Sequence, residues 1–170
     1  PVEFRLRGLT DPRAIDVIKR AAEMIGWKPR PSPNPDMAQG RFLTGRGVAY
    51  VRYKQAENYV AIAMDVAVDS TTGKINVRRV TCAHDCGLVI NPDGLKNQIE
   101  GCIVQTLGRT LHEEVKFDAS RVTSVNWASY PPLDSERLKR SSSSSSASNN
   151  RFPSPARRIR NATVSGAMLT

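Results

Sequence analysis

The sequence predicts an α+β fold with a mixed or antiparallel sheet, two main helices and a disordered tail rich in serine and arginine. Apolar residues recur at steps of three and four in two segments, which indicates amphipathic helices. Between these segments the apolar residues alternate with a period of two, as in strands. After residue 131 the composition changes abruptly. We therefore expect an ordered domain at 1–131 and a disordered tail at 132–170.

The first long helix is predicted to begin at Asp11-Pro12, because aspartate is a good N-cap and proline is favoured at the first helical position. Gly26 is a typical residue just beyond a helix end. The chain opens at Pro1 on what looks like the end of another helix, at 2–7, so we expect a piece of a longer protein. The apolar positions of the long helix are Ala14, Ile15, Ile18, Ala21, Ala22 and Ile25.

Residues 28–45 contain alternating prolines from Pro29 to Pro35 and are predicted to form a loop. Period-two alternation begins at Gly47 and is clearest at 60–68. A turn at 69–74 and a return strand from Ile75 then predict an antiparallel hairpin.

The second helix is predicted to follow Asn91-Pro92-Asp93 and to extend to about residue 114. Short strands are expected at 115–117 and 122–125, around a turn at 118–120. The apolar stripe of this helix comprises Leu95, Ile99, Cys102, Ile103, Leu107 and Leu111.

The net charge of +9 lies disproportionately in the tail. Residues 1–131 hold 18 Lys and Arg against 14 Asp and Glu, whereas residues 132–170 hold 7 against 2. The alternative function is therefore a non-enzymatic basic module whose tail binds nucleic acid or an acidic partner. The tail lacks interleaved aromatic residues, so an inert tail is favoured over nucleic-acid binding. No apolar run reaches the roughly 20 residues that cross a bilayer.

The three cysteines favour free thiols over a disulfide framework, because their number is odd. Cys82, His84 and Cys86, with Cys102 or His112, could ligate zinc. Their spacing lacks the two-residue knuckle of structural zinc sites, so a strand end with small packed thiols is favoured and no metal site is assigned.

Two glycines, Gly101 and Gly108, interrupt the second helical pattern. Each costs about 1 kcal/mol relative to alanine, which suggests close approach of a backbone or a ligand. From the pattern alone, tight helix packing is favoured over ligand approach.

Five runs of residues carry a resemblance to a known family: VEFRLR at 2–7, DPRA at 11–14, GRGVAY at 45–50, CAHDCGLVINPD at 82–93 and NQIEG at 97–101. They resemble the large (beta) subunits of the isoquinoline 1-oxidoreductase type, within the xanthine dehydrogenase/aldehyde oxidase superfamily. The resemblance covers residues 1 to about 131, and the block at 82–114 is its specific part.

The resemblance implies a fragment of a molybdopterin-binding domain from a molybdenum hydroxylase, an oxidoreductase that hydroxylates N-heterocycles or aldehydes with water. The implied cofactor is molybdenum-molybdopterin, in its cytosine dinucleotide form. Electrons would leave through a small partner subunit with [2Fe-2S] clusters. Gln98 lies at the position of the family's pterin-binding glutamine. The resemblance also implies that Gly101, which has no side chain, lets the cofactor come close to the helix. The resemblance is compatible with either the bacterial cytoplasm or the periplasm as the location of the protein.

The family's catalytic glutamate lies in a downstream G-x-G-E segment, which residues 132–170 do not contain. No catalytic residue is therefore assigned, and the chain alone is expected to be inactive. We hypothesise that the tail is read in a shifted frame. In the frame one nucleotide earlier, serine codons beginning with TC become codons for Phe, Leu, Ile or Val, so the serine run 141–146 could conceal an apolar strand. Ala156-Arg157-Arg158 can become Gly-Glu-Ala only if codon 157 is AGA or AGG, which the gene sequence would show.

Overall fold

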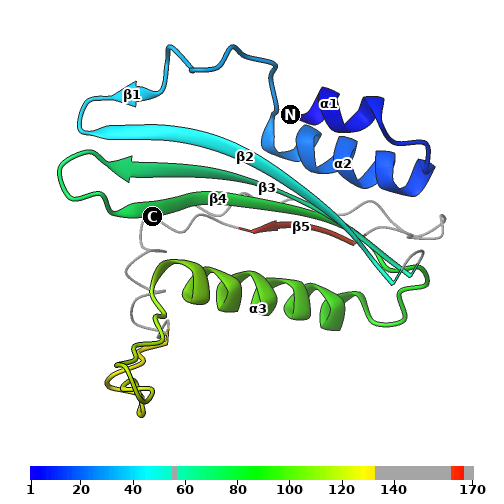
Figure 1. Ribbon diagram of the computed structural model, residues 1–170. Coiled ribbons are helices and arrows are strands. Elements are labelled where there is room, and N and C mark those ends of the chain that lie inside the picture. Colours follow the sequence, from blue (N-terminus) through cyan, green and yellow to red (C-terminus); the bar gives the residue numbers. More distant parts are fainter. Residues whose placement is uncertain (55–56, 133–161, 167–170) are drawn as a thin grey trace.

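The computed structural model describes residues 1–54, 57–132 and 162–166, and it shows an antiparallel sheet with helices on both faces. Helices α1 (Val2–Arg7) and α2 (Pro12–Ile25) lie on one face, and α3 (Pro92–Leu111) lies on the other (Figure 1). The α+β class and the two main helices are confirmed. No described helix is both long and apolar enough to cross a membrane.

Helix α2 has the ends that its sequence predicts. The side chain of Asp11 accepts a hydrogen bond from the Arg13 backbone N–H at 3.0 Å, which satisfies one of the unpaired donors of the first turn. Gly26 ends the helix in the left-handed conformation at φ 68°, where glycine has no steric penalty.

The sheet has the order β1-β2-β3-β4-β5, and all neighbouring strands are antiparallel. The register of β3 and β4 shifts between Asp65 and Val66, so that Arg78 is an extra residue in β4. The strands are β1 (Ala38–Gln39), β2 (Phe42–Tyr53), β3 (Asn58–Asp69), β4 (Ile75–Asp85) and β5 (Ala162–Gly166).

The structure differs from the sequence predictions in three segments. Strand β1 and the start of β2 lie inside the predicted loop 28–45, because pairing with the end of β3 extends β2 back to Phe42. The two short strands expected at 115–117 and 122–125 are reduced to one bridge between Phe117 and Val122. Most of the predicted disordered tail lies outside the described residues, but 162–166 form β5, which was not expected from the sequence.

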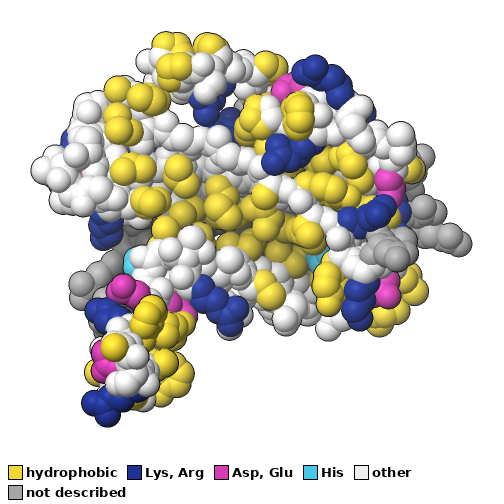
Figure 2. All heavy atoms as spheres, viewed as in Figure 1, with side chains coloured by type: hydrophobic (Ala, Val, Ile, Leu, Met, Phe, Trp, Pro, Cys, Tyr) yellow, Lys and Arg dark blue, Asp and Glu magenta, His cyan; other side chains and the backbone are white. Residues whose placement is uncertain are grey.

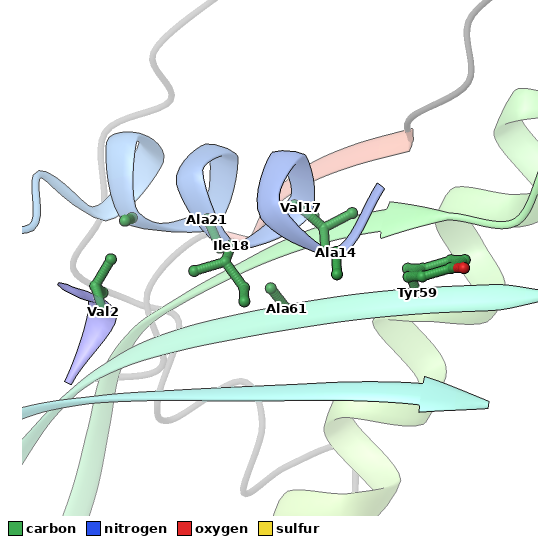
Figure 3. Packing of buried hydrophobic residues seen from close by; sticks show 9 residues of the cluster. Val2, Ala14, Val17, Ile18, Ala21, Tyr59 and Ala61 are labelled. Carbon is green, nitrogen blue, oxygen red and sulfur yellow. The ribbon is translucent and has the colours of Figure 1, made fainter. Parts of the chain in front are cut away.

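Alternate residues of β3 face different helices. Tyr59 and Ala61 pack beneath α2, whereas Val60 and Ile62 pack towards α3. The α2 side is the better-packed core, and small alanines let the helix approach the sheet closely (Figure 3). On the α3 side the buried residues are Cys82 and Ile99 in one cluster and Val77, Val80 and Leu107 in another.

Candidate functional site

Strand β4 and helix α3 are joined by a turn that side-chain hydrogen bonds hold in shape. The Gly87 backbone N–H donates to Asp85 Oδ1 at 3.0 Å, and Gly87 has φ 81°, which favours glycine. Asn91 caps α3 by accepting a hydrogen bond from the Gly94 backbone N–H at 2.9 Å. These bonds set the direction in which the first turns of α3 leave the sheet.

An ion pair ties the end of β4 to the start of α2. Arg13 donates from Nε and Nη2 to the two carboxylate oxygens of Asp85, at 2.8 and 2.9 Å, and Asp85 is only 4% exposed. The Arg13 guanidinium also lies 4.3 Å from the centre of the Tyr59 ring, and the Tyr59 hydroxyl donates to Asp11 Oδ2 at 2.7 Å. The pair was not predicted from the sequence, because 72 positions separate its members.

The two predicted cofactor-binding residues, Gln98 and Gly101, are both exposed on α3 but border different hollows: Gln98 lines the cavity beneath the helix, and Gly101 lines a pocket on another side of it. Gln98 Nε2 makes one weak contact, 3.9 Å from Cys102 Sγ, so its amide keeps most of its hydrogen-bonding capacity. Gly101 lies almost one turn further along the helix. The structure therefore places both residues where a group outside this chain could reach them.

Gly101 is not explained by tight packing within the described part of the chain. A Cβ added there would meet none of the described atoms within 4 Å, so packing against the described residues does not account for this glycine. Gly108, in contrast, is buried.

Two further polar residues continue the exposed face of α3. Gln105 and Arg109 follow Gly101 at steps of four, which keeps them on one side of the helix. We call residues 112–132 the arm; with α3 they form an open pocket of about 540 Å³, lined by Gly101, Gln105, Arg109, Trp127 and others. The sequence analysis did not identify Gln105 or Arg109 as residues that line this pocket. Their four-residue spacing from Gly101 would have placed them on the same side of the helix.

Three of the residues considered for zinc lie on the same side of the sheet. Cys82, His84 and Cys102 line a largely apolar cavity of about 370 Å³ beneath α3. Burial raises the pKa of the Cys82 thiol to about 11, so at neutral pH it is a protonated, packed thiol. Within the described ranges, no three His, Cys, Asp or Glu side chains gather in a way that could hold a metal ion.

His84 is held by a residue that sequence reasoning did not consider. Its Nε2 hydrogen-bonds Asn58 Oδ1, and burial lowers the pKa of the imidazole. Its Nδ1 is buried and has no hydrogen-bond partner among the described atoms. The ring is therefore neutral at pH 7 and presents an unpaired nitrogen near the cavity beneath α3.

Comparison with known proteins shows that the sequence matches a family of cofactor-binding domains. Residues 39–136 match the family described as the molybdopterin cofactor-binding domain. The chain is 44% identical over 139 residues to a nicotinate dehydrogenase subunit of Pseudomonas putida and 38% identical over 134 residues to the beta subunit of isoquinoline 1-oxidoreductase from Brevundimonas diminuta. It is also 35% identical over 75 residues to the nicotine 6-hydroxylase large subunit of Paenarthrobacter nicotinovorans.

The matched region covers much of this chain but little of each relative. It includes 78% of the chain for the first two relatives and 42% for the third. The chain spans only 12%, 16% and 9% of those relatives, respectively. No solved structure is significantly similar to it.

Proposed function

This chain belongs to the family of molybdopterin cofactor-binding domains, and on that premise we propose that it is part of a molybdenum hydroxylase large subunit. The proposed reaction hydroxylates an N-heterocycle or an aldehyde with water as the oxygen source. The observation that carries this proposal is the family match across residues 39–136, which includes the sheet from β2 to β4 and the whole of α3. The names of the relatives, which refer to nicotinate, isoquinoline and nicotine, support an N-heterocyclic substrate.

Gln98 and Gly101 are the residues proposed to hold the cofactor. The exposed Gln98 amide carries both a donor and an acceptor, which suits the hydrogen-bonding edge of a pterin. The open space above Gly101 lets a flat group approach the helix backbone, and it gives a reason for a residue that otherwise weakens α3. When bound, the cofactor supplies the redox chemistry, and these two residues bind and orient it.

The finer features of the cofactor and the partner are also part of the proposal. We propose the cytosine dinucleotide form of molybdenum-molybdopterin and a separate small subunit that carries [2Fe-2S] clusters and receives the electrons. The subunit designations of the relatives support a multi-subunit enzyme.

The chain by itself is proposed to be inactive. A G-x-G-E segment, the expected position of the catalytic base, is absent from its 170 residues. The residues of the chain therefore account for binding and orientation, and proton removal needs a group from elsewhere.

A chimeric protein tests the cofactor assignment. Residues 1–132 would replace the matching segment of the nicotinate dehydrogenase relative, and molybdenum and released pterin would be measured per purified chimera. We expect the chimera to hold both, and we expect Gln98→Ala to lower both several-fold because a pterin contact is lost.

The matched control is Gln105→Ala, an exposed glutamine on the same helix about 10 Å further along its axis. It should retain more cofactor than Gln98→Ala. A soluble, folded chimera that contains neither molybdenum nor pterin would rule out the proposed function. Equal cofactor content in all three proteins would rule out only the role of Gln98.

A further inference from the structure

A further pocket lies away from α3, between the loop that follows α2 and the middle of the sheet. It has a volume of about 340 Å³. Trp27, Lys28 and Arg30 contribute from the loop, Arg46 from β2 and Arg78 from β4. Neither the cofactor proposal nor the resemblance assigns a role to this pocket.

Positive charge dominates the lining of this pocket. Arg46 is neutralised by Asp65, which lies 2.5 Å from its Nε. Lys28, Arg30 and Arg78, in contrast, have no salt-bridge partner among the described residues. Three cations that share one pocket repel each other, and a multiply charged anion would relieve that repulsion.

A neutral donor adds to this arrangement. The Trp27 Nε1–H is buried and has no acceptor in the described part of the chain. An unpaired buried donor costs about 1–3 kcal/mol, so an acceptor beside it would be favourable. The side-chain amide of Asn34 also lines the pocket, and its oxygen already accepts from the Asp36 backbone N–H. Its nitrogen therefore adds another donor.

The position of Arg78 supports a built site over a chance cluster. Arg78 is the extra residue at the register shift between β3 and β4, and such bulges redirect a side chain out of the regular alternation. It is half-buried, and its guanidinium lies 6.0 Å from the centre of the Phe42 ring, which limits its freedom.

We propose that this pocket binds the phosphate group of a small phosphorylated molecule, with Lys28, Arg30 and Arg78 as the cationic contacts and Trp27 as a neutral donor. Phosphate matches the site because it carries more than one negative charge and several acceptor oxygens, whereas a single carboxylate would leave most of the positive charge unpaired. This pocket does not include Gln98 or Gly101, so the proposal does not depend on the role of those two residues.

Titration of the 170-residue chain with inorganic pyrophosphate, followed by calorimetry, tests the site. We expect saturable binding that Arg78→Gln weakens at least tenfold. The matched control is Arg121→Gln, which removes the same charge from an arm side chain that is 81% exposed and should change the affinity less than twofold. Thermal unfolding of each variant verifies that it is folded.

Trp27→Phe is the second variant, because it removes the N–H and keeps an aromatic ring. We expect weaker pyrophosphate binding without loss of stability in the free protein, since an unpaired donor has been removed. A purely structural tryptophan would show the opposite pattern. Unchanged affinity in both Arg78→Gln and Trp27→Phe, or equal losses in Arg78→Gln and Arg121→Gln, would overturn the proposal.

Titrations with further ligands distinguish the possible sources of the phosphate group. Cytidine diphosphate binding more tightly than pyrophosphate would indicate a nucleotide, and equal affinities would indicate recognition of the phosphates alone. Cytidine without phosphate should not bind. Binding of a poly-glutamate peptide without binding of pyrophosphate would overturn the proposal in favour of an acidic protein partner.

Discussion

Arginine–aspartate pairs hold the sheet at three places. Asp85 at the end of β4 pairs with Arg13, and Asp65 in the middle of β3 pairs with Arg46. Asp69 at the end of β3 accepts from Arg41 at Oδ1, 2.8 Å from Nε, and makes a second contact with its Nη2. Because the fork of an arginine matches the two oxygens of a carboxylate, each pair fixes a strand position as well as a charge.

The pairing of Asp69 predicts a pH dependence of stability. The Arg41 guanidinium holds the pKa of Asp69 well below its ordinary value of 3.8. A carboxylate with a lowered pKa in the folded state adds stability above pH 3.8, and that stability is lost as the pH falls below it. We expect Asp69→Asn to be less stable at pH 7 and to lose less stability below about pH 4 than the wild type, as measured by urea unfolding.

Asp36→Asn is the control, since Asp36 is exposed and no salt bridge joins it to the described residues. Parallel pH profiles of Asp69→Asn and the wild type would contradict the stabilising role of this pair.

The three cysteines are predicted to differ in reactivity. Cys82 is buried and its pKa is raised to about 11, whereas Cys102 is exposed and Cys86 is half-buried. Thiolates are the reactive form, so an alkylating reagent at about pH 8 should modify Cys102 first and leave Cys82 unmodified in the folded protein. Peptide mass spectrometry measures the order, and all three should react in urea. Early modification of Cys82 in the folded protein would contradict its burial.

At the scale of elements, α3 combines one buried stripe with one exposed polar face. Leu107 and Ile99 face the sheet, Gly101 and Gln105 face outward, and the exposed Gln98 lies at the edge of the cavity beneath the helix. Most helical stability comes from packing of the apolar stripe, so the outward face is free to serve another group. Glycine at position 101 lowers the stability of the helix, and no contact with the described residues offsets this loss.

This view of α3 predicts that Gly101→Ala stabilises the chain by about 1 kcal/mol, because the alanine has a higher helix propensity and its Cβ meets no neighbour. Urea unfolding of the full chain measures the change. Gly26→Ala is the matched control with the opposite sign, since Gly26 has φ 68° and alanine there should cost about 1 kcal/mol. Destabilisation by Gly101→Ala would show that the helix needs a glycine for its own packing.

At the scale of the whole molecule, the two faces of the sheet are covered unequally. Val48 and Tyr50 of β2 pack into the α2 cluster, whereas Val51 and Tyr53 point to the other side and remain 54% and 60% exposed. Hydrophobic side chains are visible between the helical layers and on the arm (Figure 2). Arm residues Phe117, Val125 and Trp127 are each more than three-quarters exposed.

The unequal cover predicts unequal effects of substitution on neighbouring strands. Ala61→Val adds volume to a fully buried position beneath α2 and should cost about 1–3 kcal/mol. Val51→Thr changes the open face and should alter the unfolding free energy by less than about 0.5 kcal/mol. Both are measured by urea unfolding of the full chain. Equal costs would indicate that the open face is in fact packed.

The sequence by itself determined the fold class, the ends of α2, the start of α3 and the family. These features depend on local periodicity, capping residues and short runs, all of which can be read from neighbouring positions. It also indicated Gln98 and Gly101, through the resemblance, and their role stays a prediction.

Only the tertiary structure decided which residues meet across the sheet. The Arg13–Asp85 pair, the orphaned indole of Trp27 and the open space above Gly101 depend on contacts or gaps between segments that are distant in the sequence. Likewise, the period-two pattern predicted that β3 is a strand. Only the packing of α2 on one face of the sheet decided that Ala61 and Ala63 of β3 are fully buried. Local periodicity carries no information about such long-range contacts, because packing assigns each strand face to its partner.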